Sequence, residues 1–264
     1  MKRTALLFLI VLMIAPFTYR AVSQEVLDGI YVKEHVPAKK PVPYYFIREA
    51  DMMWTKRIWR MVELTEKINL PLYYPKEPMN DRYSLIDLIL WGVENGEIIV
   101  YNPIDDEFKV PMTLEEIDEK LGAGVDTTYV YNPETEMQEM KVIEGTRKTD
   151  EVQKLLIKEE WFFDKQRSAM DVRIIGMCPV RVYYREDDLE QTDRLMKKVL
   201  WVYFPAVRPV FANHEVFNPF NDAERKTFDD IFFKRRFSSY VFQESNVHNN
   251  RPITTYKVGR DALL

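Results

Sequence analysis

The histidines and the single cysteine are the first residues of this 264-residue chain to consider for chemistry. His35, His214 and His248 are far apart and show neither an HExxH pattern nor another metal-ligand spacing, so each is interpreted as a surface or capping residue. Cys178 lies in the apolar run 174–179, which indicates a buried core thiol rather than a nucleophile. These residues predict no metal site.

Paired carboxylates could bind a metal or exchange protons, and the chain has three pairs of adjacent aspartates: Asp105-Asp106, Asp187-Asp188 and Asp229-Asp230. The first two stand in polar stretches and the third on a predicted helix, where adjacent side chains diverge by about 100°, so solvation is the preferred interpretation. Ser238, Ser239 and His248 are too dispersed to form a catalytic triad. The chain also lacks a GxSxG elbow, a P-loop and a GxGxxG loop. We therefore expect no enzyme, no catalytic residue and no cofactor.

The N-terminus has the pattern of a secretory signal peptide. Lys2 and Arg3 precede an apolar run over 5–17, and Ala21 and Ser23 stand just before Gln24. The run is too short for a membrane span and no second long apolar run follows, which predicts no direct membrane insertion. We expect residues 1–23 to be removed from an exported, periplasmic protein. Because no cysteine stands near the cleavage point, attachment to a membrane would require a partner.

The charge balance weighs against nucleic acid and anionic lipid as ligands. Removal of residues 1–23 takes away Lys2, Arg3 and Arg20, so the 37 basic residues become 34 against 42 acidic ones, a formal charge of −8. The remaining 241 residues are enough for a sizeable hydrophobic core. One cysteine excludes an intrachain disulfide, so this core must supply the stability.

Residues 24–46 carry Pro37, Pro41 and Pro43 and predict an extended arm, because proline lacks an amide donor and biases the preceding residue to extended geometry. Residues 47–264 are predicted to form a single α+β domain, with a possible division into two subdomains near residue 147. The predicted helices cover 48–68, 84–93, a segment opening at Thr113, 150–166 and 222–236. The predicted strands cover 97–101, a pair within 125–142, 170–184 and 199–211. This mixed order favours mixed helices with a largely antiparallel sheet over a doubly wound parallel sheet.

Exposed aromatic residues are the candidate interface. In the predicted helix 48–68, Met52 and Trp59 fall among charged residues on the face opposite the apolar stripe. Phe233 in the predicted helix 222–236 and Phe237 directly after it lie toward the flanks of the apolar stripe. One interpretation is a partner-binding surface, so that Trp59→Ala would weaken complex assembly more than monomer stability. The alternative is that a loop or the arm covers Trp59, and that the second helix simply has a solvated charged face.

Four segments carry a resemblance to a known family. They are WTKRIWRMVELTEKINLPLYYP at 54–75, YSLIDLILWGVENGEIIVY at 83–101, KEEWFFDKQRSAMDVRIIGMCPV at 158–180 and VFNPFNDAERKTFDDIFFKRRFSSYVFQESNV at 216–247. In this order they resemble the PorN/GldN family, periplasmic ring proteins of the type IX secretion and gliding-motility machinery of Bacteroidetes. The resemblance covers nearly the whole mature chain and implies that the family continues beyond Leu264.

The resemblance implies a non-enzymatic structural component of a periplasmic ring associated with the outer membrane. The implied partners are further copies of the chain, a PorK/GldK-type outer-membrane lipoprotein and a PorM/GldM-type motor shaft. We expect the arm to lie along the lipoprotein, with Tyr44, Tyr45 and Phe46 as aromatic anchors. The alternative from another class is a periplasmic glycan- or small-ligand-binding module, because exposed Trp and Tyr rings also stack on sugars.

Overall fold

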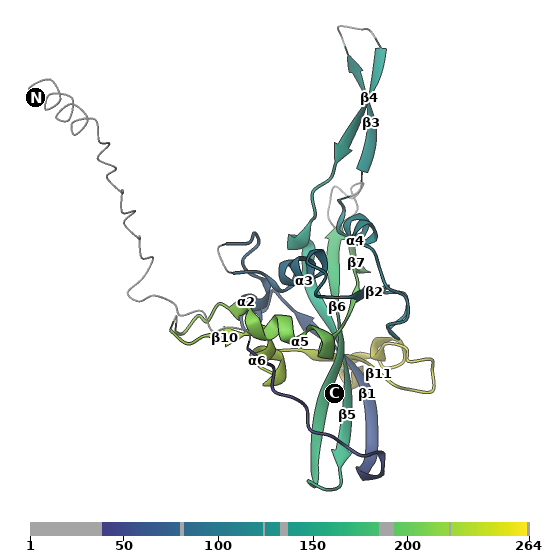
Figure 1. Ribbon diagram of the computed structural model, residues 1–264. Helices are drawn as coiled ribbons and strands as arrows, with labels where there is room; N and C mark the ends of the chain where they lie inside the picture. The colour runs from purple at the N-terminus through teal and green to yellow at the C-terminus, as the bar shows by residue number, and fades with distance from the viewer. Residues whose placement is uncertain are drawn as a thin grey trace, which may run out of the picture. The chain divides into compact units, whose positions relative to one another are not determined.

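The structure of the protein, a computed structural model, describes residues 39–79, 82–123, 125–132, 137–184, 193–221 and 223–262 (Figure 1). The predicted signal peptide 1–23 and residues 24–38 of the predicted arm lie outside the described residues. The described residues belong to one compact unit, which begins at Ala38 in the chain.

Among the described residues, seven strands form one sheet in which every strand pair is antiparallel. Its order is β11-β1-β5-β6-β8-β2, with β7 also paired to β6. These strands are β1 (Met52–Glu63), β2 (Val100–Tyr101), β5 (Val152–Asp164), β6 (Ala169–Tyr184), β7 (Arg194–Lys198), β8 (Trp201–Tyr203) and β11 (Tyr240–Glu244). Two separate pairs are β3 (Val125–Asn132) with β4 (Met137–Glu144), and β9 (Glu215–Val216) with β10 (Lys226–Thr227). The predicted α+β class, with a largely antiparallel sheet, is confirmed.

The α-helices of the described residues are short. They are α2 (Leu70–Tyr73), α3 (Leu85–Glu94), α4 (Leu114–Leu121), α5 (Phe204–Asn213) and α6 (Phe228–Phe233), and single 3-10 turns occur at η1 (Glu49–Asp51), η2 (Thr149–Glu151), η3 (Ile253–Thr255) and η4 (Gly259–Ala262). Two predicted starts are confirmed: the Ser84 side chain caps α3, and Thr113 with Glu116 forms a capping box at α4. Gly122 ends α4 in the left-handed region, at a φ of 84°.

The helices predicted over 48–68 and 150–166 are wrong, because these segments form the long strands β1 and β5. In the centre of the sheet a strand is buried on both faces, so Leu155, Leu156 and Ile157 are all buried and the alternation that marks a half-exposed strand disappears. In β1 the apolar residues Trp54, Ile58 and Met61 match helical spacing by coincidence, although polar residues separate them.

The predicted strand 199–211 and helix 222–236 are wrong over part of their lengths. Only Trp201–Tyr203 is extended, and the chain then enters α5, with a proline in its first turn, where a missing amide donor costs nothing. Helix α6 is confined to six residues, and its capping box is formed by Thr227 with Asp230 rather than by Asn221 with Glu224. Local β propensity in α5 was overridden by packing against the sheet.

The core lies on both faces of the sheet, and α3, α5 and α6 lie on one side of it (Figure 1). The large cluster joins this helical layer to one sheet face through residues such as Ile89, Leu155, Phe211 and Phe232. A smaller cluster on the other face consists of Trp59, Met61, Leu156, Cys178, Val180 and Trp201. Cys178 is fully buried, as predicted for a core thiol, and this burial raises its pKa to about 12.

Candidate interaction surfaces

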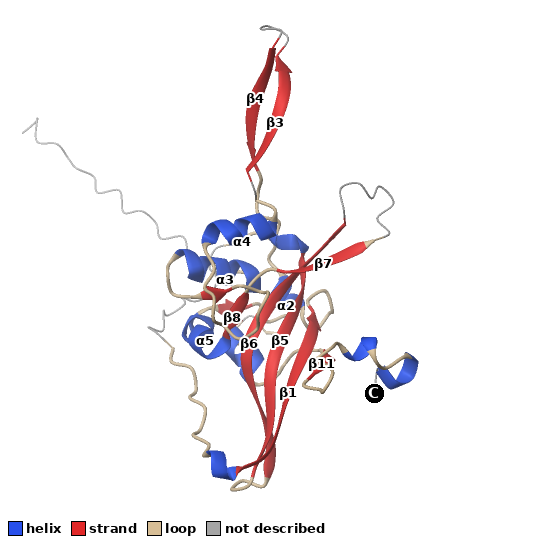
Figure 2. Ribbon diagram, turned by 90° about the vertical axis from the view of Figure 1, so that its right-hand side faces the viewer, coloured by secondary structure: helices blue, strands red, loops and turns tan. Residues whose placement is uncertain are grey.

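Part of β1 has an unpaired edge among the described residues. From Ile58 to Met61, β1 is paired with β5 on one side and with β11 on the other. A hydrogen bond from the Ser245 amide to the Arg57 carbonyl, 2.9 Å long, continues the β11 side by one residue. The residues before it, 52–56, are paired with β5 alone, and we call them the open β1 edge. Figure 2 shows this half of β1 at the outer border of the sheet, beyond β11.

Three of the five residues of the open β1 edge, Met52, Met53 and Trp54, are apolar. Met53 is 68% exposed and Trp54 46% exposed, while Met52 is 38% exposed at the start of the strand. Free backbone donors and acceptors next to exposed apolar side chains form a template for another strand, and proteins usually protect such edges with charges or proline. This edge therefore has the chemistry of a β-pairing site.

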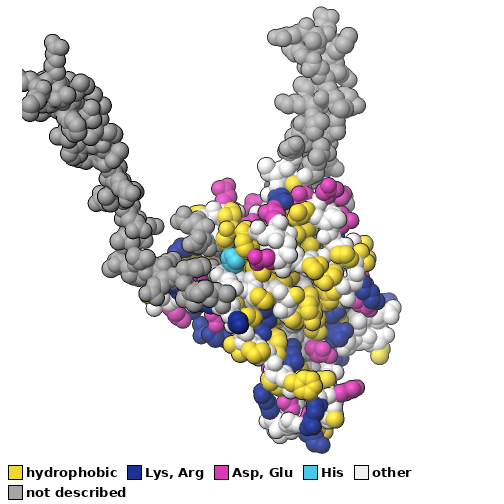
Figure 3. Space-filling model, viewed as in Figure 1, with side chains coloured by type: hydrophobic (Ala, Val, Ile, Leu, Met, Phe, Trp, Pro, Cys, Tyr) yellow, Lys and Arg dark blue, Asp and Glu magenta, His cyan; other side chains and the backbone are white. Residues whose placement is uncertain are grey.

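A row of apolar side chains continues from this edge across one sheet face. The register places Trp54 opposite Phe163 on β5, and Phe163 opposite Met170 on β6. Directly paired residues point to the same face of a sheet, so these three side chains lie side by side, and we call them the tip patch. Met170 is 55% exposed and Phe163 half-buried. Figure 3 shows hydrophobic side chains among Lys and Arg where this end of the sheet lies.

The described end of the predicted arm lies against its own domain. The Tyr44 ring is 5.8 Å from the Phe233 ring and 4.7 Å from the Arg208 guanidinium. The Tyr45 ring lies 3.4 Å from the Arg167 guanidinium, and its hydroxyl donates to Asp171 Oδ2 at 3.1 Å. Burial raises the pKa of both tyrosines, and the Asp171 bond adds to the rise for Tyr45. Two of the three expected partner anchors are thus used within the chain.

The other predicted interface residues differ in their surroundings. Phe46 is 88% exposed and is the free aromatic side chain of the described arm. Phe233 is 39% exposed, although Tyr44 and Arg208 pack on its ring. Phe237 packs against the large core cluster and contacts Phe232 at 5.8 Å between ring centroids. Of the two predicted interface residues, Phe237 therefore belongs to the border of the core, and Phe233 is the one that is exposed at the surface.

Trp59 is buried, which corrects the prediction of a tryptophan stranded on a charged helix face. It is 4% exposed on β1, and its indole N–H donates to Asp106 Oδ2 at 2.9 Å. The Lys158 ammonium lies 5.8 Å from the ring and 3.1 Å from the same carboxylate oxygen. The alternative prediction, in which a loop covers Trp59, is confirmed, because Asp106 belongs to the loop after β2.

Trp59→Ala is accordingly expected to lower the free energy of unfolding by about 3–5 kcal/mol, the usual cost of removing a buried aromatic side chain. Urea denaturation followed by circular dichroism would measure the loss. The matched control is Trp54→Ala on the same strand, where an exposed substitution should change stability by less than about 0.5 kcal/mol. Similar losses for the two variants would contradict the burial of Trp59.

Two of the aspartate pairs predicted to be solvated have specific partners instead. Asp229 is buried and accepts two hydrogen bonds from Arg208, at 2.7 and 3.0 Å, while Asp230 caps α6. Asp106 holds Trp59 and Lys158, and Asp105 accepts from the Glu107 amide at 2.8 Å. The pair Asp187-Asp188 lies outside the described residues. The sequence signal that was missed is Arg208, a single charge within the otherwise apolar helix α5.

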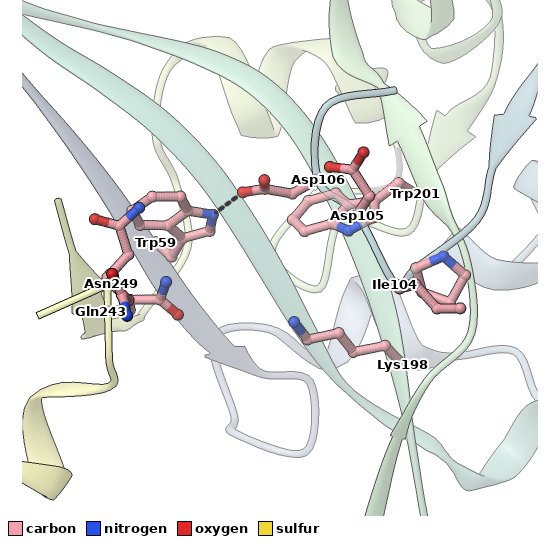
Figure 4. A pocket seen from close by; sticks show the side chains of 10 residues that line it. Trp59, Ile104, Asp105, Asp106, Lys198, Trp201, Gln243 and Asn249 are labelled. Atoms are coloured by element: carbon pink, nitrogen blue, oxygen red, sulfur yellow. Dashed lines mark hydrogen bonds between the residues drawn. The ribbon is translucent and has the colours of Figure 1, made fainter. Parts of the chain in front are cut away.

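A polar pocket opens between the smaller core cluster and the loop after β2. Its volume is about 390 Å³, and it is lined by Trp59, Pro103, Ile104, Asp105, Asp106, Lys198, Trp201, Gln243, Asn249 and Asn250. Figure 4 shows the Trp59–Asp106 hydrogen bond and the Lys198 side chain extending toward the two indoles. Trp201 is fully buried, and its Nε1 has no hydrogen-bond acceptor among the described residues.

The histidines take part in packing. His214 Nδ1 lies 2.9 Å from the Val210 carbonyl oxygen, and its ring contacts Tyr83 and Trp91. The His248 ring lies 5.9 Å from that of Tyr256, whereas His35 is outside the described residues. In the part of the chain that the structure describes, no group of three or more His, Cys, Asp or Glu side chains is placed to hold a metal ion. None of the described helices combines the length and the apolar character needed to cross a membrane.

Comparison with models of protein families gives a match. The family model described as gliding motility associated protein GldN matches residues 47–264, which is most of the chain and includes the whole sheet. No curated protein matches the sequence.

Proposed function

The chain belongs to the GldN family of gliding motility associated proteins, and we propose that it is a non-enzymatic structural component of a ring complex that serves type IX protein secretion and gliding motility. In this proposal residues 1–23 direct export, and the mature protein works in the periplasm. A PorK/GldK-type lipoprotein holds it at the outer membrane, and a PorM/GldM-type shaft contacts the ring.

The observation that carries the structural role is the open β1 edge together with the tip patch. A head-to-tail ring needs two different surface patches on each copy, and each patch binds the complementary patch of a neighbouring copy. A strand edge that the described residues leave unpaired supports such a patch, because a second chain can supply its main-chain hydrogen bonds. The tip patch extends the same area with Trp54 and Met170, which are large exposed side chains of the kind that form interface anchors.

The arm is proposed to reach the lipoprotein with residues 24–38 and Phe46. Tyr44 and Tyr45 fix its last residues to the chain's own domain, through Arg208 and Arg167. This attachment would give the preceding residues a defined starting point, which reduces the entropy lost on binding. The proposed lipoprotein contact is thus assigned to residues 24–38 and Phe46 rather than to the two tyrosines.

The test is to tag the protein in its native host, extract the envelope gently and examine the purified material by native gel, electron microscopy and mass spectrometry. We expect a megadalton ring that contains the lipoprotein. A variant lacking residues 24–38 should remain folded but be recovered without the lipoprotein. A lone monomer, even after mild cross-linking before extraction, would contradict the ring, and retained lipoprotein in the deletion variant would contradict the role of the arm.

A further inference from the structure

We propose that the pocket between Trp59 and Trp201, called here the tryptophan pocket, binds a neutral carbohydrate. This inference goes beyond the proposed ring role and does not depend on it. It rests on the unsatisfied donor in the pocket, on the balance of charges around it and on the mixture of indole and carboxamide groups in its lining.

The indole N–H of Trp201 has no hydrogen-bond acceptor among the described residues, and an oxygen atom of a ligand could accept from it. Trp201 is fully buried, and its Nε1 is one of two buried side-chain nitrogen or oxygen atoms without a partner among the described residues. Trp59 on the neighbouring side of the pocket has its indole N–H satisfied by Asp106 at 2.9 Å. Buried donors are satisfied in the great majority of cases, so the exception at Trp201 marks the place where a ligand hydroxyl or carbonyl would fit.

The charges favour a neutral ligand. Asp105 and Asp106 line the pocket with Lys198, and Lys158 lies behind Asp106 with its ammonium 2.7 Å from the Asp106 carbonyl. The two negative and two positive charges lie close together, so the net charge around the pocket is zero. The two carboxylates would repel an anionic ligand, and the two ammonium groups would repel a cationic one. A neutral molecule therefore has the least unfavourable electrostatic interaction with the pocket.

The remaining lining suits a molecule with many hydroxyl groups. Gln243, Asn249 and Asn250 each present a carboxamide, which both donates and accepts, as sugar hydroxyls do. The buried side chains of Trp59 and Trp201 form the wall behind these polar groups. A volume of about 390 Å³ lies within the range of about 300–1,000 Å³ of small-molecule sites and admits a mono- or disaccharide. The polar lining is unsuited to an acyl chain.

Indole N–H resonances provide the test. The mature chain is labelled with 15N-tryptophan, which gives one indole signal for each of its five tryptophans, and is titrated with glucose, N-acetylglucosamine and chitobiose. We expect a saturable shift of the Trp201 signal, with a smaller shift for Trp59, while the exposed Trp54 signal stays in place. N-acetylmuramic acid, which carries a carboxylate, should bind less well than N-acetylglucosamine.

Two variants locate the site. Trp201→Phe keeps a ring but removes the donor and should weaken binding at least tenfold. Asn249→Gly removes the carboxamide of an exposed loop residue whose φ of 57° glycine also adopts, so the protein should fold normally and still lose several-fold in affinity. Trp54→Phe is the matched control and should bind as the parent does. No shift of the Trp59 and Trp201 signals with any of the neutral sugars, or binding that survives both pocket variants, would overturn the proposal, as would tighter binding of the acidic sugar.

Discussion

Asp229→Ala is expected to lower the free energy of unfolding by about 3–5 kcal/mol, because it leaves the Arg208 guanidinium buried without its counter-ion. Asp229 and Arg208 are 7% and 4% exposed, and their two parallel hydrogen bonds measure 2.7 and 3.0 Å. The pair joins α5 to α6, and the Tyr44 ring lies over the guanidinium at 4.7 Å. Loss of one partner should therefore loosen the packing of both helices and of the arm.

Urea denaturation would measure this loss, with two variants for comparison. Asp230→Ala removes the neighbouring carboxylate, which caps α6 in a partly exposed position, and should cost only about 1 kcal/mol. A double variant, Arg208→Met with Asp229→Leu, replaces both charges by apolar groups and should recover much of the stability that Asp229→Ala loses. If Asp229→Ala lowered the free energy of unfolding no more than Asp230→Ala does, the expectation that Arg208 stays buried without a counter-ion would be wrong.

The sequence was sufficient for the fold class and for elements whose ends carry their own signals. Ser84 and Thr113 both act as predicted caps, and β3 pairs with β4 where a strand pair was expected within 125–142. These signals are local, since a cap or a turn depends on a few neighbouring residues. The core thiol at Cys178 was also predictable from its apolar neighbours.

The candidate site was less predictable, because burial depends on partners far away in the chain. Trp59 is covered by Asp106, 47 positions further on, and nothing within its own segment indicates this. Once 48–68 was assigned as a helix, the spacing of Met52 and Trp59 suggested a shared exposed face, whereas the strand leaves Met52 exposed and Trp59 buried. Similarly, the Arg208–Asp229 pair joins residues 21 positions apart. Which strand edge stays unpaired depends on the order of strands in the sheet. The sequence does not give this order, so the open β1 edge could not be predicted from it.

Met53→Lys combined with Trp54→Lys is expected to abolish ring assembly while leaving the monomer folded. The two side chains are 68% and 46% exposed, so their replacement should change the free energy of unfolding by about 0.5 kcal/mol or less each. At the interface the same change removes an aromatic anchor, typically worth at least 2 kcal/mol, which corresponds to roughly a 30-fold loss of affinity. Lysine on an edge strand also opposes pairing directly, because the approaching strand must desolvate its charge.

Sedimentation of the purified complexes, beside thermal denaturation of the monomers, would separate the two effects. The matched control is Ile99→Lys combined with Val110→Lys, which introduces the same charges at positions that are 64% and 57% exposed but lie outside the open β1 edge. Rings that form normally in the edge variant would exclude this surface from the assembly. If both double variants failed to assemble, added charge rather than the strand edge would be the cause. Loss in the edge variant alone, with an unchanged melting temperature, would place a contact between chains at 52–56, where an exposed apolar pair coincides with backbone that is unpaired among the described residues.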